Sequence, residues 1–122
     1  MYKDGKGYHK LLIWQRSREL LKLIYLHSEK FPKSEEFGLK SQIRRAAVSV
    51  ILNIVEGYRR STTKDFLHFL NISNGSLAEL EAALEIALDL NFITQNSYSE
   101  VDSKRSEVGF LLHKFIESLK GK

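Results

Sequence analysis

Apolar residues recur every three or four positions along most of the chain, which is the spacing of one face of an amphipathic helix. Four stretches carry this pattern: residues 8–31, 35–59, 63–90 and 98–120. The chain has only one proline, Pro32, and few signals typical of strands and tight turns. Because short connections make consecutive helices neighbours, the pattern predicts an all-α, antiparallel up-down four-helix bundle. At this length we expect a single domain over residues 1–122.

Residues with capping side chains indicate where the helices begin and end. The first helix is expected to end at Phe31 and Pro32, because proline cannot continue a helix. Ser34 precedes two glutamates and is the predicted N-cap of the second helix. The third and fourth helices each follow a capping-box pattern: Thr62 with Asp65, and Ser97 with Glu100.

The second helix is unusually apolar. Between Arg45 and Gly57 its only polar residues are Ser49, Asn53 and Glu56. We therefore expect burial on more than one face, which implies a partner beyond the chain's own bundle. The three polar residues share one helix face by their spacing. They either fix the register within one bundle or meet a second subunit, and a buried Glu56 would need a cation or hydrogen bonds.

Gly75 lies in the middle of the third predicted helix, within a run of small and polar residues from Asn71 to Ser76. A glycine there costs about 1 kcal/mol of helix stability relative to alanine. We expect the compensation to be close approach of a neighbouring backbone. A kink or a break in the helix is the alternative, although the apolar spacing resumes in phase at Leu77.

The net charge of +4 is unevenly distributed. Residues 1–34 carry eight basic and three acidic side chains, and residues 40–64 carry six basic side chains and one acidic. Residues 65–107 carry eight acidic and two basic side chains. Such a dipolar chain can attract polyanions with one side, or can pair opposite faces between copies of itself.

The basic residues around the second helix are the candidates for contacts with nucleic-acid phosphates, together with a set from the N-terminal part. The first group is Arg44, Arg45, Arg59, Arg60 and Lys64, and the second is Lys3, Lys6, Lys10, Arg16, Arg18 and Lys22. No recognition-helix, zinc-finger or RNA-recognition pattern accompanies them, so binding would be dominated by the backbone and sensitive to salt. A solvated basic face without a specific role is the alternative.

Other classes of function have little support in the sequence. There is no cysteine and no stretch resembling a signal peptide or a membrane span, so we expect a cytoplasmic protein without disulfides or membrane contact. Asp65 and His68 form one carboxylate-x-x-His pair, whereas a di-iron bundle needs two such pairs and two further carboxylates. No nucleophile elbow or phosphate loop is present. We predict no metal, no cofactor and no catalytic residues.

Several motifs occurring in one order carry a resemblance to a known family. They are Phe31-Pro32, Glu36 to Leu39, Gln42 to Val50, Asn53 to Gly57, Phe66 to Leu70 and Gly75 to Glu81. Over residues 11 to 93 the chain resembles the four-helix-bundle proteins encoded in intervening sequences of 23S ribosomal RNA. Val55, where alanine is common, is a small departure.

This resemblance implies a homo-oligomer, with a pentamer as the best guess. Similar proteins include the accessory variability determinant of diversity-generating retroelements, a basic pentamer that binds nucleic acid and a reverse transcriptase. By analogy this supports RNA or DNA binding here. The alternative is a scaffold that presents its surface to a protein partner, with the basic residues serving structure alone.

Overall fold

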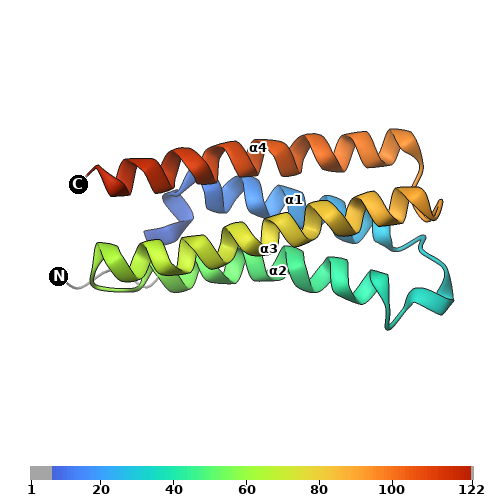
Figure 1. Ribbon diagram of the computed structural model, residues 1–122, viewed down its shortest axis with the longest axis horizontal. Helices are drawn as coiled ribbons and strands as arrows, with labels where there is room; N and C mark the ends of the chain where they lie inside the picture. The colour runs from blue at the N-terminus through green and yellow to red at the C-terminus, as the bar shows by residue number, and fades with distance from the viewer. Residues whose placement is uncertain (1–6, 122) are drawn as a thin grey trace.

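A computed structural model describes residues 7–121, and every regular element in that range is helical (Figure 1). Four long helices follow one another, with a short 3-10 turn before each of the first two. The elements are η1 (Gly7–Lys10), α1 (Leu12–Ser28), η2 (Lys33–Glu35), α2 (Leu39–Tyr58), α3 (Thr63–Asp89) and α4 (Gln95–Lys120). The four predicted helices are therefore present, the third almost within its predicted bounds. Residues 1–6 and 122, at the ends of the predicted domain, lie outside the described range.

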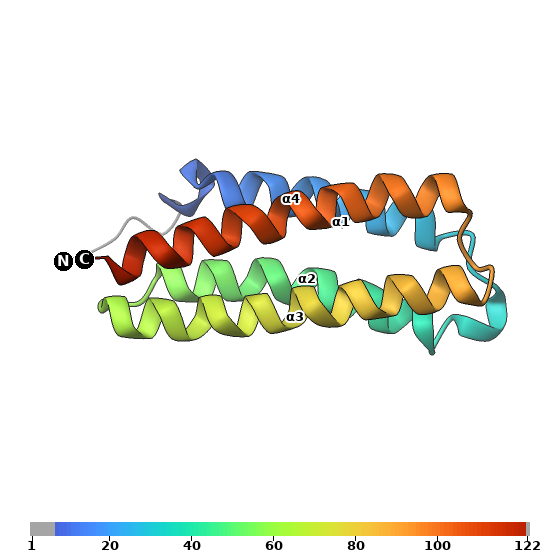
Figure 2. The ribbon, with the colours of Figure 1, turned by 45° about the horizontal axis from the view of Figure 1, so that its top comes forward.

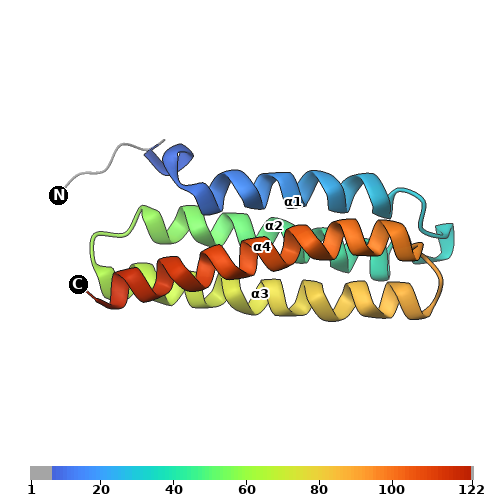
Figure 3. The same ribbon diagram turned by 90° about the horizontal axis from the view of Figure 1, so that it is seen from above.

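The four helices form a bundle of two layers, α1 with α4 above and α2 with α3 below (Figure 2). Each helix packs against two others: α1 and α3 each contact both α2 and α4. The connections lie at the two ends of the bundle, so helices consecutive in sequence run antiparallel (Figure 3). This confirms the predicted all-α four-helix bundle.

The predicted apolar stripes converge on one core between the two layers. Every long helix contributes side chains that are almost fully buried, including Leu20, Ile24, Ile54, Leu70, Leu80, Leu84, Val101 and Leu112. Burial of a leucine or isoleucine side chain stabilises the fold by roughly 1.5–3 kcal/mol, so this core is the main source of stability. Within the described residues no helix is long and apolar enough to cross a membrane.

Two helix starts differ from the sequence-based expectation. The predicted cap Ser34 lies inside η2, and α2 begins only at Leu39, whose backbone N–H donates to the Glu35 carboxylate at 2.9 Å. Ser97 is likewise not a cap, because Thr94 accepts the Ser97 N–H at 3.2 Å and α4 begins at Gln95. In both places another side chain nearby satisfies the free backbone donors, which moves the start of the helix.

The Thr62 cap of α3 is confirmed: its hydroxyl oxygen accepts the backbone N–H of Asp65 at 3.1 Å. Replacing a capping threonine with alanine leaves this donor without its partner and typically costs about 1 kcal/mol. We expect Thr62→Ala to lower the free energy of unfolding by about that amount in chemical denaturation. Thr63→Ala, one residue into the helix, is the matched control and should have little effect. Equal losses for both variants would contradict the cap.

A network of ion pairs fastens α1 to α4. Lys104 of α4 donates to Glu19 of α1 at 2.8 Å and to Glu107 at 2.9 Å. Arg16 of α1 lies 2.9 Å from Glu19 and 3.4 Å from Glu107. These hydrogen bonds raise the pKa of the Lys104 ammonium, and the bond from Lys104 lowers the pKa of the Glu19 carboxyl. Arg16 is therefore engaged inside the bundle.

Candidate nucleic-acid and subunit interfaces

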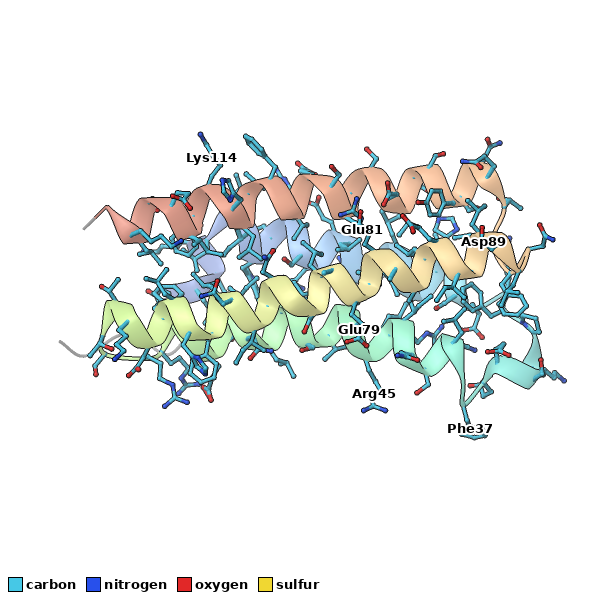
Figure 4. All side chains as sticks on the ribbon, viewed as in Figure 1. Phe37, Arg45, Glu79, Glu81, Asp89 and Lys114 are labelled. Carbon is cyan, nitrogen blue, oxygen red and sulfur yellow. The ribbon has the colours of Figure 1, made fainter. Side chains whose placement is uncertain are left out.

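The outer face of α2 carries apolar side chains that the bundle does not cover. Leu52 is 60% exposed, and Val48 and Val55 beside it are only partly buried. Phe37, in the turn before α2, is 95% exposed and points away from the bundle on the same side as Arg45 (Figure 4). The expected burial of this helix on more than one face is therefore not achieved within a single chain.

Ser49 and Asn53 belong to a polar cluster between α2 and α3. The hydroxyls of Ser49 and Ser76 lie 2.7 Å apart, and the Asn53 amide donates to the Ser49 carbonyl at 2.8 Å and to its hydroxyl at 3.1 Å. Below them the buried Ser73 donates to the Val50 carbonyl at 2.8 Å. The cluster links the two helices at a defined register, which agrees with the register-fixing alternative for Ser49 and Asn53.

Glu56 does not join this cluster. Its side chain is about half exposed, at 48%, and it pairs with Arg60 one turn further along α2 at 3.2 Å. Of the two alternatives for Glu56, burial within the single bundle does not apply, because the residue lies outside the α2–α3 contact. A role in a subunit interface stays a prediction.

Gly75 is exposed and α3 runs through it without a break. A Cβ atom built at this position would have no heavy atom within 4 Å. Neither a kink nor close approach of another part of the described chain explains this glycine. Its place in a subunit interface also stays a prediction.

The basic candidates on α2 differ in how far they are engaged. Arg44 donates to the Ser28 hydroxyl at 2.9 Å, to the Tyr25 carbonyl at 3.1 Å and to Glu29 at 3.0 Å, and it stacks over the Tyr25 ring. Its hydrogen bond lowers the pKa of the Glu29 carboxyl. The guanidinium of Arg44 therefore holds α1 and α2 together.

The other candidates are more available. Arg45, Arg59 and Lys64 are exposed and form no hydrogen bond or ion pair within residues 7–121. Arg60 stacks over the Phe69 ring at 4.7 Å and is still 43% exposed. Arg59, Arg60 and Lys64 cluster around the short turn between α2 and α3, at the end of the bundle where α1 begins and α4 ends (Figure 1).

Further cations gather at this end of the bundle because antiparallel packing brings the start of α1 and the end of α4 to it. They are the exposed side chains Lys10, Arg18, Lys114 and Lys120. Sequence reasoning missed Lys114 and Lys120, which are distant in the chain, and a helix-level map of charge would have been needed to find them. We call the exposed cations Lys10, Arg18, Arg59, Arg60, Lys64, Lys114 and Lys120 the basic end. Lys3 and Lys6 lie outside the described range.

The described residues contain no group of three or more side chains with the donors and spacing of a metal site, Asp65 and His68 included. What they present is a rigid helical scaffold with a concentration of cations at one end and apolar side chains on the outer face of α2. The class of molecule defined in this way is a basic, all-α four-helix bundle.

Comparison with known proteins identifies the family to which this chain belongs. Residues 9–114 match the model of the 23S rRNA-intervening sequence protein family, and the chain belongs to that family. A similar solved structure is that of a protein of unknown function from the S23 ribosomal protein family of Bacteroides thetaiotaomicron. It shares 26% identity with a TM-score of 0.78, over 86% of this chain and 98% of that chain. No curated protein matches the chain.

Proposed function

We propose that this protein is a non-enzymatic homo-oligomer, with a pentamer as the best guess, that binds the backbone of RNA or DNA through its basic end. The observation that supports nucleic-acid binding is the set of exposed cations around the α2–α3 turn, of which Arg59 and Lys64 have no partner within residues 7–121. Arginine and lysine in such a cluster attract phosphate, and no ion pair within residues 7–121 neutralises the charges of Arg59 and Lys64.

Binding of this kind does not depend on base sequence. The end of a helical bundle presents no helix or strand that could enter a groove of the nucleic acid and contact base edges. The basic side chains would therefore contact phosphates, and each such contact would release counterions from the nucleic acid. Assembly would strengthen the binding, because several basic ends in one particle engage one strand together and raise the effective concentration. This also explains why a chain with a modest net charge of +4 could bind a polyanion.

The test is the salt dependence of RNA binding, followed by fluorescence anisotropy with a labelled mixed-sequence RNA. We expect affinity to fall steeply with salt, and Arg59→Ala/Lys64→Ala to reduce the slope of log K against log salt by about 2, or about 1 for each phosphate contact removed. Lys30→Ala/Lys33→Ala removes two exposed lysines from the opposite end of the bundle and is the matched control.

Equal slopes for the two double variants would remove the basic end from the binding site. Absence of RNA and DNA binding at low salt would favour the alternative function, a scaffold for a protein partner. The oligomer is tested separately by light scattering behind size exclusion, where a mass of 14.1 kDa, that of one chain, would contradict assembly.

A further inference from the structure

Two exposed stripes on the lower layer of the bundle both carry apolar side chains and are opposite in charge. The first, which we call the α2 ridge, consists of Phe37, Arg45 and Leu52. The second, which we call the α3 stripe, consists of Ile72, Glu79 and Ile86. Accepting the proposed assembly, we infer that the α2 ridge of one copy packs against the α3 stripe of the next copy, a head-to-tail contact.

The α2 ridge points straight out from the bundle. Arg45 and Leu52 are seven residues apart, two turns of helix, and therefore lie on one face of α2. In Figure 4 Phe37 and Arg45 both project from the bundle on the same side. Phe37 is almost wholly solvent-exposed in the single chain, which is unfavourable for an aromatic side chain that other apolar groups could cover.

The α3 stripe has the same repeat. Ile72, Glu79 and Ile86 are spaced by seven residues and share one face of α3. Ile72 is 40% exposed and Ile86 is 48% exposed, and Glu79 forms no ion pair within residues 7–121. The stripe is therefore apolar at both ends and acidic in the middle, whereas the α2 ridge is apolar at both ends and basic in the middle.

The heights of these residues along the bundle are fixed by the hydrogen bonds between α2 and α3. Ser49 and Ser76 are in contact and so lie at one level. One turn from that level in one direction are Arg45 and Glu79, and one turn in the other direction are Leu52 and Ile72. Arg45 and Glu79 also line the same open groove between the helices, and they stand at one level in Figure 4.

Ile86 lies two turns beyond Glu79 on α3. Phe37, in the turn before α2, lies beyond Arg45 toward the same end of the bundle, and in Figure 4 it stands near the level of Asp89, within about one turn of Ile86. Rotation about an axis parallel to the bundle keeps every residue at its height. In a ring built in this way Leu52 therefore meets Ile72, and Phe37 meets Ile86. The same rotation places Arg45 opposite Glu79, so each level pairs apolar with apolar or cation with anion.

Gly75 lies on α3 between Ile72 and Glu79, and it is open to solvent. Because a Cβ at this position would meet nothing in its own chain, the glycine leaves a flat place where the backbone of a second α2 can approach α3 closely. The single chain offers no other explanation for a glycine at the centre of its longest helix. The inferred contact supplies one.

The occupant of each stripe is a second copy of this chain, because each chain carries both complementary surfaces. A contact between different surfaces leaves one ridge and one stripe free at the two ends of any open assembly, so it repeats until a ring closes. This agrees with the proposed oligomer without fixing its size. It also places Arg45 in the subunit contact and leaves nucleic-acid binding to the basic end.

The test uses two variants that block one surface each. Phe37→Glu/Leu52→Glu blocks the α2 ridge and leaves the α3 stripe intact, and Ile72→Glu/Ile86→Glu does the reverse. Because both changes introduce negative charge, the two blocked surfaces cannot pair with each other in a mixture. We expect each variant alone to have the mass of one chain, 14.1 kDa, in light scattering behind size exclusion. An equimolar mixture should give a particle of twice that mass and no larger, because only one productive contact can form.

Matched controls carry the same chemistry on other faces. Leu26 on α1 and Phe110 on α4 are each 62% exposed and lie outside the lower layer, so Leu26→Glu and Phe110→Glu should keep the wild-type mass. Circular dichroism and thermal melting check that each variant is folded. If a double variant loses its helical signal, Leu52→Gln and Ile72→Gln replace it, and we expect each to raise the dissociation constant of the assembly at least tenfold.

The outcomes separate this inference from the proposed assembly. Blocked variants that keep the wild-type mass would overturn the contact while the assembly stands. Two variants of single-chain mass that fail to combine when mixed would show that an intact ridge does not bind an intact stripe, which also overturns the head-to-tail contact. A variant that pairs with itself would show that its intact surface meets its own kind. A wild-type protein with the mass of one chain would overturn the assembly itself and the contact with it.

Discussion

Leu80→Ala should be among the most destabilising single truncations in this protein, lowering the free energy of unfolding by about 2–5 kcal/mol. Leu80 lies in the middle of α3, is fully buried and belongs to the core between the two layers. Truncation to alanine removes buried apolar area and leaves a cavity that rigid neighbouring helices cannot fill completely. The loss would be a large fraction of the total stability expected for a domain of this size.

The matched control is Leu26→Ala, the same chemical change on the outer face of α1, where the side chain is mostly exposed. We expect a change within about 0.5 kcal/mol, as for other surface substitutions. Both values come from urea denaturation followed by circular dichroism, at one protein concentration because the proposed assembly would make stability depend on concentration. If both variants lowered the free energy of unfolding by similar amounts, Leu80 would not be a core residue, which would contradict the packing of the four helices described above.

The fold was predictable because apolar spacing reports the face that a helix buries, and four long stripes leave few other arrangements. The residues that begin each helix were less predictable. At the start of α4, Thr94 and Ser97 are both good capping residues three positions apart, and local sequence does not show which one the tertiary structure will use. The same holds at α2, where a glutamate side chain takes the role expected of Ser34.

The candidate interfaces could be predicted only in part. Arg44 and Arg45 are neighbours in sequence, yet one helix position turns a side chain by about 100°. That turn places Arg44 against α1, where it is fully engaged, and leaves Arg45 in solvent. A count of basic residues in the sequence cannot distinguish the engaged Arg44 from the exposed Arg45. Lys114 and Lys120 join the basic end only through the antiparallel return of α4, which no local pattern contains.

The last prediction concerns two glycines in helix interiors. Replacement with alanine should destabilise the fold at one of them and stabilise it at the other. Gly57 is buried near the end of α2, where α3 starts. A Cβ there would stand 2.9 Å from Phe66 Cδ1, 3.0 Å from Phe69 Cβ and 3.1 Å from the Phe66 carbonyl oxygen. The Phe66 carbonyl oxygen is a backbone atom, and the Phe69 Cβ is bonded directly to the backbone. Neither atom can move unless α3 itself shifts.

We therefore expect Gly57→Ala to lower the free energy of unfolding by up to about 2 kcal/mol. Overpacking of about 1–3 kcal/mol outweighs the gain of about 1 kcal/mol that alanine brings to a helix. Gly75→Ala has only the gain, because no atom of its own chain lies near, and should raise stability by up to about 1 kcal/mol. Urea denaturation of both variants in the Leu52→Glu background, which the inferred contact predicts to be a single chain, gives the comparison.

The same pair also reports on the inferred assembly. In the otherwise wild-type chain, an alanine at Gly75 would meet the approaching helix of the next copy, so Gly75→Ala should weaken assembly while it stabilises the single chain. Gly57 lies inside the α2–α3 contact of its own chain, so its variant should alter stability alone. A Gly75→Ala protein that assembles as tightly as the wild type would show that no backbone approaches α3 at this glycine.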